Sequence, residues 1–410
     1  MGEFMLAFSN KIIILKDKIK IKNSSDFYDI NDDMYDYLKR LYESSFKEFN
    51  CEKDVDQFLI DENIIVTVNS NNTYNPFVKN QKHIQTELNR LFIQVTEQCN
   101  LRCKHCYVES CPEKTTKLTK KDIIQFVEKA IEIGITQVDF TGGEIFMEGY
   151  IFELLEYLSE KPVTVTLFSN LTLLNEKQIL KLKKYSCLRD IITSIDYNTP
   201  EKHNIFRGGK NAYQKTQNNI KLLLDLGIKV KINTLVMDDN HQDVVEIFKD
   251  FTSIGITCNL DNIIPEGRMI TKKEINENAK KNALVISTIM NCFQEKKEIC
   301  IKNIEPFNKE ISGEFCGVGK SMIYITASGD VTLCPSLTEG FKLGTIYDKE
   351  LSNIVDNLKK FNKLSCERSD CKFIEKCTGG CRARAMRYLG RITNPDPIAC
   401  IRFGVDKYEN

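Results

Sequence analysis

Three cysteines lie close together in the stretch EQCNLRCKHCY, with three and then two residues between them: Cys99, Cys103 and Cys106. Thiolates on one short loop can hold three irons of a cubane iron–sulfur cluster and leave the fourth iron without a protein ligand. The alternatives are a zinc site or chance clustering. Structural zinc sites take four ligands, usually as two separated pairs, and His105, inside the loop, is badly placed to complete a tetrahedron. The spacing therefore favours an iron–sulfur cluster.

Most of the other cysteines also cluster, near the C-terminus. The chain has 16 cysteines in 410 residues. Disulfides do not account for them in a cytoplasmic protein, whose thiols are kept reduced, and buried cysteines that act as small apolar side chains account for only a few. Metal ligation is the better interpretation of this second group. Its members are Cys316, Cys334, Cys366, Cys371, Cys377, Cys381 and Cys400.

Composition and charge limit the other classes of function. Lys and Arg together number 57, as do Asp and Glu, so the formal net charge is zero. That balance favours binding neither to nucleic acid nor to an anionic membrane. No apolar run reaches the roughly 20 residues of a membrane span. The N-terminus lacks a secretion signal, so we expect a cytoplasmic protein, with Met5 as its natural start and residues 1–4 left from a cloning vector.

Three segments must position these residues. The first, residues 5–85, opens with two alternating stretches typical of a β-hairpin. A helix that begins after Asn31, a second short helix near 52–61 and the strand IIVTV follow. The polar stretch 69–77 is the expected linker. The last segment, residues 300–410, is rich in cysteines and turns.

The middle segment, residues 89–297, alternates strands with amphipathic helices. One helix begins at Thr119, with Asp122 as its capping-box partner, and another covers 212–226 and ends at Gly227. Six strand–helix units predict an α/β fold with right-handed crossovers, and six is short of the eight strands of a closed barrel. We therefore expect a partial (β/α)6 TIM barrel that binds ligands at the carboxyl ends of its strands. The predicted strands begin at Leu91, Gln137, Val163, Asp190, Lys229 and Thr257.

The cysteine loop resembles the CxxxCxxC signature of radical S-adenosylmethionine (radical SAM) enzymes, including the aromatic Tyr107 directly after the third cysteine. In that family the motif follows the first barrel strand, as it does here. The resemblance implies a [4Fe–4S] cluster that cleaves S-adenosylmethionine, with flavodoxin or ferredoxin as the electron donor. The implied catalytic ligands are Cys99, Cys103 and Cys106.

Polar residues at the later strand ends resemble the cofactor contacts of the same family. The stretch TGGE is similar to the family's GGE motif, which binds the methionyl amino group; paired glycines allow close backbone approach, and a carboxylate suits an ammonium. An ordinary turn or a solvated loop is the alternative at each position, and their shared order is what favours a cofactor site. The stretch from Pro265 to Arg268 is similar to a later strand end. The implied cofactor-binding residues are Tyr107, Thr141, Gly142, Gly143, Glu144, Ser169, Asn170, Ser194, Asp196, Arg207 and Asn233.

The stretch CERSDCKFIEKCTGGC resembles a SPASM domain, the auxiliary-cluster extension of peptide-modifying radical enzymes, although its first two cysteines are four residues apart where that family has two. The resemblance implies two auxiliary [4Fe–4S] clusters. One is fully ligated, by Cys366, Cys371, Cys377 and Cys400. The other has three ligands, Cys316, Cys334 and Cys381. Its fourth position is either filled from upstream, by Cys292 or Cys300, or open to a substrate thiolate; two zinc sites are the alternative to both clusters. Most of the remaining cysteines are expected to be structural: Cys51, Cys111, Cys187, Cys258, Cys292 and Cys300.

The first segment resembles the precursor-recognition element of ribosomal peptide maturases, a small winged-helix-like fold related to PqqD. The shared features are the opening hairpin, the helix start DINDDMYDYL and the short helix before IIVTV. Such domains bind a leader peptide as an added strand, with main-chain hydrogen bonds giving affinity. The alternative is an accessory dimerisation or packing domain.

Together these resemblances imply a maturase similar to sactisynthases and ranthipeptide synthases, that is, a peptide thioether synthase. A 5′-deoxyadenosyl radical would take a hydrogen from the core peptide, a cysteine sulfur would bond to that carbon, and the auxiliary clusters would take up an electron. Other products remain open: a carbon–carbon crosslink, an epimerised residue, or an oxidised serine or cysteine. The non-enzyme alternative is a zinc-binding peptide escort.

Overall fold

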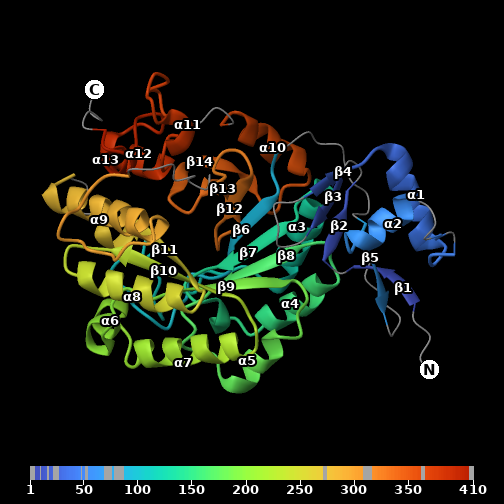
Figure 1. The fold of residues 1–410 in the computed structure, drawn as a ribbon, viewed down its shortest axis with the longest axis horizontal. Helices are drawn as coiled ribbons and strands as arrows, with labels where there is room; N and C mark the ends of the chain where they lie inside the picture. Colours follow the sequence, from blue (N-terminus) through green and yellow to red (C-terminus); the bar gives the residue numbers. More distant parts are fainter. Residues whose placement is uncertain are drawn as a thin grey trace.

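The computed structural model describes residues 5–9, 11–15, 18–21, 27–47, 49–50, 54–68, 76–77, 87–270, 275–307, 316–361 and 365–405. The first four residues, Cys51 and most of the expected linker at 69–77 lie outside the described residues. Figure 1 shows a large α/β body, a smaller N-terminal unit at one side of it, and the C-terminal helices above one end of its sheet.

The N-terminal unit contains two small antiparallel sheets and two helices. Its elements are β1 (Met5–Phe8), β2 (Ile12–Ile14), β3 (Lys18–Ile21), β4 (Phe27–Asp29), α1 (Asp32–Glu43), α2 (Asp54–Asp61) and β5 (Ile65–Val68). β1 pairs with β5, and β2, β3 and β4 form the other sheet in that order. The predicted hairpin, both helices and the closing strand are confirmed.

Strand β2 joins this unit to the rest of the molecule. Ile12 and Ile14 pack in the unit's own core, together with Leu38 of α1, whereas Ile13 and Leu15 belong to the core of the large body. Successive side chains of a strand point to opposite faces, so one short apolar run can serve two cores. The N-terminal unit is therefore packed on the barrel and not merely tethered to it.

Six parallel strands, adjacent in chain order, form the centre of the large body. They are β6 (Arg90–Gln94), β7 (Gln137–Thr141), β8 (Thr164–Phe168), β9 (Leu188–Ser194), β10 (Val230–Val236) and β11 (Thr257–Asn262). Each predicted strand is present, and the curved, open sheet is the expected partial TIM-like barrel. All six run in the same direction, so their carboxyl ends meet at one rim.

The helices between these strands begin and end at the signals in the sequence. Thr119 and Asp122 form the predicted capping box, and the helix over 212–225 ends just before Gly227, which has φ +74°. Figure 1 shows α4 to α8 arranged around the strands. The helical elements are α3 (Lys120–Glu132), η1 (Ile145–Met147), α4 (Ile151–Ser159), α5 (Glu176–Leu182), α6 (Pro200–Arg207), α7 (Ala212–Asp225), α8 (His241–Ser253), η2 (Gly267–Met269) and α9 (Glu277–Gln294).

The sheet continues into the C-terminal segment, which the sequence did not indicate. β12 (Met322–Ile325) pairs in parallel with β6, and β13 (Asp330–Cys334) and β14 (Leu337–Thr345) extend the sheet in antiparallel fashion. Of the strands described, nine therefore form one sheet, with β11 and β14 at its edges. The cysteine-rich segment is thereby anchored to β6, the strand that leads into the Cys99–Cys106 loop.

Four short helices complete the C-terminal segment: α10 (Leu351–Lys359), α11 (Ile374–Cys377), α12 (Arg382–Leu389) and α13 (Pro397–Arg402). Arg384 of α12 binds the buried carboxylate of Asp396 with its Nε and Nη2 atoms at 2.8–3.2 Å, and Asp396 also caps α13. This ion pair fixes the two helices relative to each other. No helix in the described part of the chain combines the length and apolar character needed to cross a membrane.

Candidate functional site

Residues 98–111, which follow β6, form a loop that carries Cys99, Cys103 and Cys106; we call it the cluster loop. Backbone N–H groups already point at two sulfurs, from Leu101 to Cys99 (3.4 Å) and from Ser110 to Cys106 (3.3 Å). Burial, with smaller contributions from Glu144, Cys103 and Cys106, raises the pKa of Cys99 to about 12. Such thiols stay protonated alone and give up their protons to a metal, so this donor set fits an iron–sulfur cluster.

Two glycines after β7 bring that strand end against the cluster loop. A Cβ on Gly142 would lie 2.7 Å from the Thr96 carbonyl oxygen, and one on Gly143 would lie 2.2 Å from that of Gln98. The Gly143 N–H donates to Thr96 O (2.7 Å), and the Glu144 N–H donates to Gln98 O (2.9 Å). In the structure, these glycines thus allow the backbone after β7 to pack closely against the chain's own backbone just before Cys99.

Glycines from two other loops hold the opposite side of the cluster loop. A Cβ on Gly208, after α6, would lie 2.7 Å from Arg102 O, and one on Gly267, after β11, would lie 2.4 Å from Cys106 O. Both glycines have positive φ, +66° and +55°, where a side chain is strained in any case. The backbone of three separate connections, after β7, α6 and β11, therefore packs closely against the cluster loop.

Arg268, beside Gly267, adds a side-chain clamp. Its guanidinium donates to the carbonyl oxygens of Cys103 (2.8 Å) and Ser110 (2.5 Å). Its backbone N–H donates to Cys106 O at 3.2 Å. Arg268 thus binds the loop at two of its three cysteines, and each of these hydrogen bonds goes to a main-chain carbonyl oxygen.

Arg207 and Asp196 form a buried ion pair behind the cluster loop. The Arg207 guanidinium donates to one Asp196 oxygen from Nε (2.7 Å) and Nη2 (2.5 Å), and its Nη1 lies 3.9 Å from the Cys103 sulfur. Burial opposes ionisation of Asp196, but the charge of Arg207, together with smaller contributions from His105, His203 and the Leu235 N–H, holds the pKa of Asp196 below its usual value. Arg207 therefore presents a fixed positive charge to Cys103.

Glu144 is fully buried at the end of β7. Its carboxylate accepts hydrogen bonds from Ser169 Oγ (2.8 Å), the Asn170 N–H (2.7 Å) and the Phe146 N–H (3.1 Å). Burial outweighs these donors and raises the pKa of Glu144 to about 7. The Asn170 amide also donates to Asn100 of the cluster loop (3.0 Å), so β7 and β8 position the carboxylate and the loop together.

The other residues expected to bind the cofactor lie at the same rim with fewer contacts. Thr141 is buried, and its carbonyl accepts the Val95 N–H at 2.8 Å. Ser194 and Asn233 are half-buried partners across the β9–β10 pair. Glu266 instead pairs with Arg387 of α12 (2.6 Å), which ties the end of β11 to the C-terminal segment.

The C-terminal cysteines interact in two groups in the structure, and their assignment as ligands of two clusters stays a prediction. Cys334 interacts electrostatically with Cys381 and Cys316, and burial raises its pKa. Cys400, whose pKa burial raises to about 12, interacts with Cys377, Cys366 and Cys371. Among the residues described, no three Cys, His, Asp or Glu side chains converge tightly enough to share a single ion. A cubane cluster asks less of the protein, because each thiolate binds a different iron.

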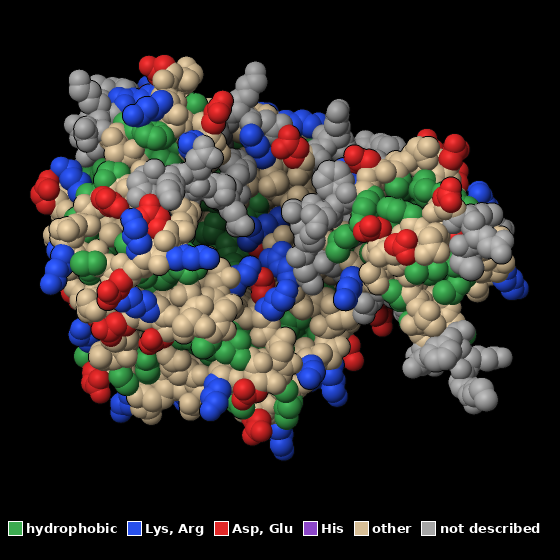
Figure 2. Space-filling view, in the orientation of Figure 1, with side chains coloured by type: hydrophobic (Ala, Val, Ile, Leu, Met, Phe, Trp, Pro, Cys, Tyr) green, Lys and Arg blue, Asp and Glu red, His purple; other side chains and the backbone are tan. Residues whose placement is uncertain are grey.

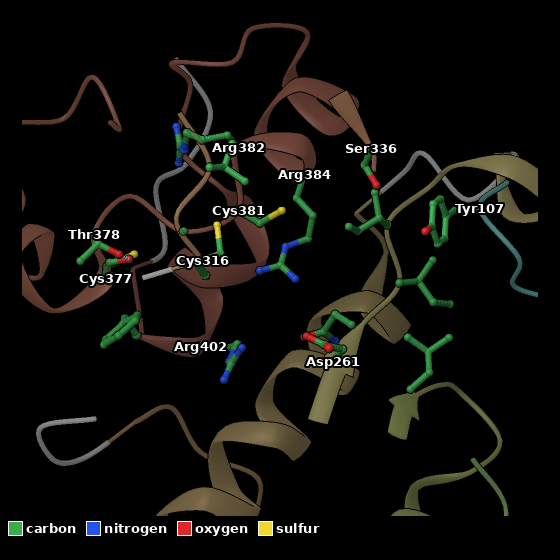
Figure 3. Close-up of a pocket in the computed structure, with 18 of the residues that line it drawn as sticks. Tyr107, Asp261, Cys316, Ser336, Cys377, Thr378, Cys381, Arg382, Arg384 and Arg402 are labelled. Atoms are coloured by element: carbon green, nitrogen blue, oxygen red, sulfur yellow. Dashed lines mark hydrogen bonds between the residues drawn. The ribbon is translucent and has the colours of Figure 1, made fainter. Parts of the chain in front are cut away.

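A cavity of about 500 Å³ lies between the cluster loop, the ends of β10 and β11, and the C-terminal segment. His105 and Tyr107 of the cluster loop line one side of it, and Cys316, Cys377 and Cys381 line the other. Figure 3 shows the Cys316 and Cys381 sulfurs near the middle of the view, with Tyr107 across the space from them. Figure 2 shows the molecule hollowed at this place, with Lys and Arg side chains beside the opening.

Several residues of the cavity wall were not singled out in the sequence. His105, which was given no role, stacks on Phe206 with ring centroids 4.8 Å apart, and burial lowers its pKa to about 4, so it is neutral. Arg384 and Arg402 line the cavity from the C-terminal segment. In the sequence, the one signal that His105 belongs to the site was its position between two cysteines. Neither Cys292 nor Cys300 lines the cavity, and Cys300 is exposed.

Two family models match the chain. Residues 93–251 match the radical SAM superfamily, and residues 316–382 match SPASM, an iron–sulfur cluster-binding domain. The chain thus carries a radical SAM domain, which binds a [4Fe–4S] cluster and S-adenosylmethionine, and a C-terminal SPASM domain, which binds auxiliary iron–sulfur clusters.

Curated relatives and solved structures agree with this organisation. The antilisterial bacteriocin subtilosin biosynthesis protein AlbA of Bacillus subtilis is 27% identical over 306 residues, 72% of this chain and 67% of the relative. The AdoMet-dependent heme synthase of Nitratidesulfovibrio vulgaris is 24% identical over 335 residues, 74% of this chain and 90% of the relative. Streptococcus suis SuiB bound to its precursor peptide SuiA superposes with a TM-score of 0.66 at 16% identity, covering 93% of this chain and 97% of SuiB. At that identity the last match shows the fold alone.

Proposed function

We propose that this chain, a radical SAM protein with a SPASM domain, is a peptide maturase that joins a cysteine sulfur to a carbon of a ribosomally made precursor. A cavity that is lined by both the cluster loop and the C-terminal cysteines carries the proposal. A substrate in that space meets the radical source on one side and the auxiliary cysteines on the other. AlbA, a bacteriocin biosynthesis protein, supports a peptide as the substrate.

The chain's own residues bind and orient the reactants. Cys99, Cys103 and Cys106 hold the first cluster, while Arg207 and the backbone N–H groups at the sulfurs stabilise its thiolates. Glu144 holds the ammonium of S-adenosylmethionine by charge. When bound, these cofactors supply a radical that removes one hydrogen atom from the peptide and accept the electron released on bond formation.

A thioether is the product that this arrangement favours. The peptide carbon loses a hydrogen atom, the cysteine thiol loses a proton, a sulfur–carbon bond forms and one electron leaves. Cys316, Cys334 and Cys381 would supply three thiolates to an auxiliary cluster, and two of them line the cavity, so the remaining iron would be accessible to the thiolate of a substrate cysteine. Such a ligand would give up its thiol proton and would be held beside the peptide carbon.

The test is co-expression with a short cysteine-containing peptide encoded beside this gene, followed by mass spectrometry. We expect the peptide to lose two hydrogens per modification and one thiol reactive toward iodoacetamide. Loss of two hydrogens with every thiol retained would indicate a carbon–carbon crosslink or an oxidised serine, and an unchanged mass with a D-residue would indicate epimerisation. If anaerobic reconstitution yields no cluster absorbance and no 5′-deoxyadenosine, the enzyme proposal is wrong. The remaining interpretation is then a zinc-binding peptide escort.

The N-terminal unit is part of the proposal as the leader-binding domain. Within the described residues, β4 has a neighbouring strand on one side only, so its other edge can accept an added strand. Beside it, Phe58 of α2 packs edge-on against Tyr28 of β4, and both Phe58 and Val55 remain 39% exposed. A leader strand on β4 would cover these apolar side chains.

Phe58→Asp is expected to weaken binding of the full-length precursor by about tenfold, because a charge replaces apolar contact area at the leader site. The measurement is KM for full-length and leaderless precursor with the same enzyme. Leu180→Asp, an equally apolar, exposed position (50%) on α5, is the matched control and should leave KM unchanged. An equal rise in KM for the leaderless peptide would remove the leader-binding role from this unit.

A further inference from the structure

The wall of the cavity carries more positive than negative charge. Four basic side chains line it, against one acidic side chain, Asp261. Two of the basic groups have structural partners: Arg384 binds Asp396, and Arg382 donates from Nη1 to the carbonyl oxygens of Ile392 and Asn394, each at 2.9 Å. Both arginines help to hold the C-terminal helices and loops in place, but only the charge of Arg384 is paired with a carboxylate.

Arg402 is the cavity arginine without such a partner. Its guanidinium makes no hydrogen bond or ion pair with any residue that the structure describes, and its buried Nε has no acceptor. Its side chain lies over the Phe307 ring, with the guanidinium carbon 4.9 Å from the ring centroid. A half-buried cation with no counter-charge in contact is favourably placed to bind an anion.

Arg402 lines the cavity together with Arg384, Asp261 and two of the auxiliary cysteines. Figure 3 shows the guanidinium groups of Arg384 and Arg402 directed into the same part of the cavity, with Asp261 at the adjoining wall. Asp261 is exposed at the end of β11 and acts on Arg402 only through space. Cys316 and Cys381 line the same space, so a group held on Arg402 lies beside the auxiliary cysteines.

We infer that Arg402 is a specificity-determining residue that docks a carboxylate of the peptide substrate. The inference rests on the proposed function and deepens it by defining the substrate: a peptide with an acidic group close to the cysteine that is modified. Guanidinium groups bind carboxylates with paired, charge-assisted hydrogen bonds, so an acidic peptide is held in one register. The carboxylate is either an Asp or Glu side chain or the C-terminus of the peptide.

Binding of synthetic peptides to the reconstituted full-length protein, with S-adenosylmethionine and without reductant, tests the inference. The probes are rhodamine-labelled heptapeptides with a central Cys and one Asp at a flanking position, each matched by an Asn peptide, all with amidated C-termini. We expect the best Asp peptide to bind the wild type about tenfold or more tightly than its Asn counterpart. An Asn peptide with a free C-terminal carboxylate that binds equally well assigns the group to the C-terminus.

Variants then distinguish the contribution of Arg402 to peptide binding from that of the other residues of the cavity wall. Arg402→Gln should bind Asp and Asn peptides equally, Arg402→Lys should keep part of the preference, and Arg402→Glu should prefer a Lys peptide. Lys359→Gln, which removes one charge from the exposed side of α10, is the matched control and should behave as the wild type. The reversed preference of Arg402→Glu cannot arise from misfolding, so it keeps the test decisive if Arg402→Gln loses stability.

Two outcomes overturn the inference. One is equal affinity of the wild type for all Asp, Asn and free-acid peptides. The other is an unchanged peptide preference in Arg402→Gln together with a shifted reduction potential of the auxiliary clusters, which would make those clusters the partner of Arg402. The assay involves no turnover, so a failed thioether reaction with intact Asp preference contradicts the proposed product and not the carboxylate site.

Discussion

Replacement of Gly143 by alanine is expected to prevent the iron–sulfur cluster from forming on the cluster loop. The new Cβ would lie 2.2 Å from Gln98 O, 2.6 Å from Gln98 C and 2.8 Å from Glu97 O, all main-chain atoms that cannot rotate away. The backbone just before Cys99 must therefore move by more than a side-chain adjustment. Displacements of about 1 Å at a catalytic group cost on the order of 100-fold in rate, and we expect at least that loss in S-adenosylmethionine cleavage.

Gly149 offers a matched control for this experiment. It lies six residues further along the same connection, and a Cβ there meets no atom within 4 Å. Gly149→Ala should therefore reconstitute as the wild type does. The measurements are iron and sulfide per chain after anaerobic reconstitution and the rate of 5′-deoxyadenosine formation with dithionite or reduced flavodoxin. A Gly143→Ala protein with full iron content and activity would show that the contact at Gly143 is not needed to position the loop.

Binding of S-adenosylmethionine is expected to weaken as the pH falls through about 7. Burial raises the pKa of Glu144 to about 7, so the free protein loses the carboxylate charge at a pH where most acidic side chains keep theirs. Only the ionised form attracts the ligand's ammonium, so below that pKa each pH unit should cost about tenfold in affinity. The ligand's own α-amino group loses its proton near pH 8, which limits affinity on the alkaline side.

Equilibrium dialysis of S-adenosylmethionine against the unreduced, reconstituted protein between pH 5.5 and 7.5 measures this effect. Glu144→Gln should bind about 10- to 100-fold more weakly at pH 7.5 and should lose the acidic limb. Glu148→Gln is the control, because Glu148 is also buried near this strand end but pairs with Lys117 (3.0 Å). An acidic limb that persists in Glu144→Gln would assign the titration to another group.

The elements that the sequence predicted correctly are those stabilised by local interactions. Asn31 caps α1 and Thr119 pairs with Asp122 because each cap bonds to groups three residues away, which the local sequence specifies. The six barrel strands are short apolar runs between turn signals, and every one was placed to within two residues of its start. Periodicity and capping chemistry act over a few residues, so a sequence alone contains them.

The elements that it did not predict depend on contacts between distant parts of the chain. The pairing of β12 with β6 joins residues more than 200 positions apart, and the sequence of neither strand indicates which strand it will pair with. The paired glycines were expected to admit a ligand, and only the folded chain shows that Gly142 and Gly143 face the backbone of Thr96 and Gln98. The lack of a hydrogen-bond or ion-pair partner for Arg402 among the described residues is likewise visible only in the folded structure.

By itself, the sequence determined which chemistry the protein can carry: cysteine spacing and glycine-containing strand ends depend on residue type and local order, and they indicated a radical enzyme with auxiliary clusters. The tertiary structure decided where that chemistry is directed. It brought the members of each set of C-terminal cysteines together, placed the cluster loop across one cavity from Cys316, Cys377 and Cys381, and left Arg402 facing that space. Burial and distance between remote side chains exist only after folding, so substrate selection was beyond what the sequence could show.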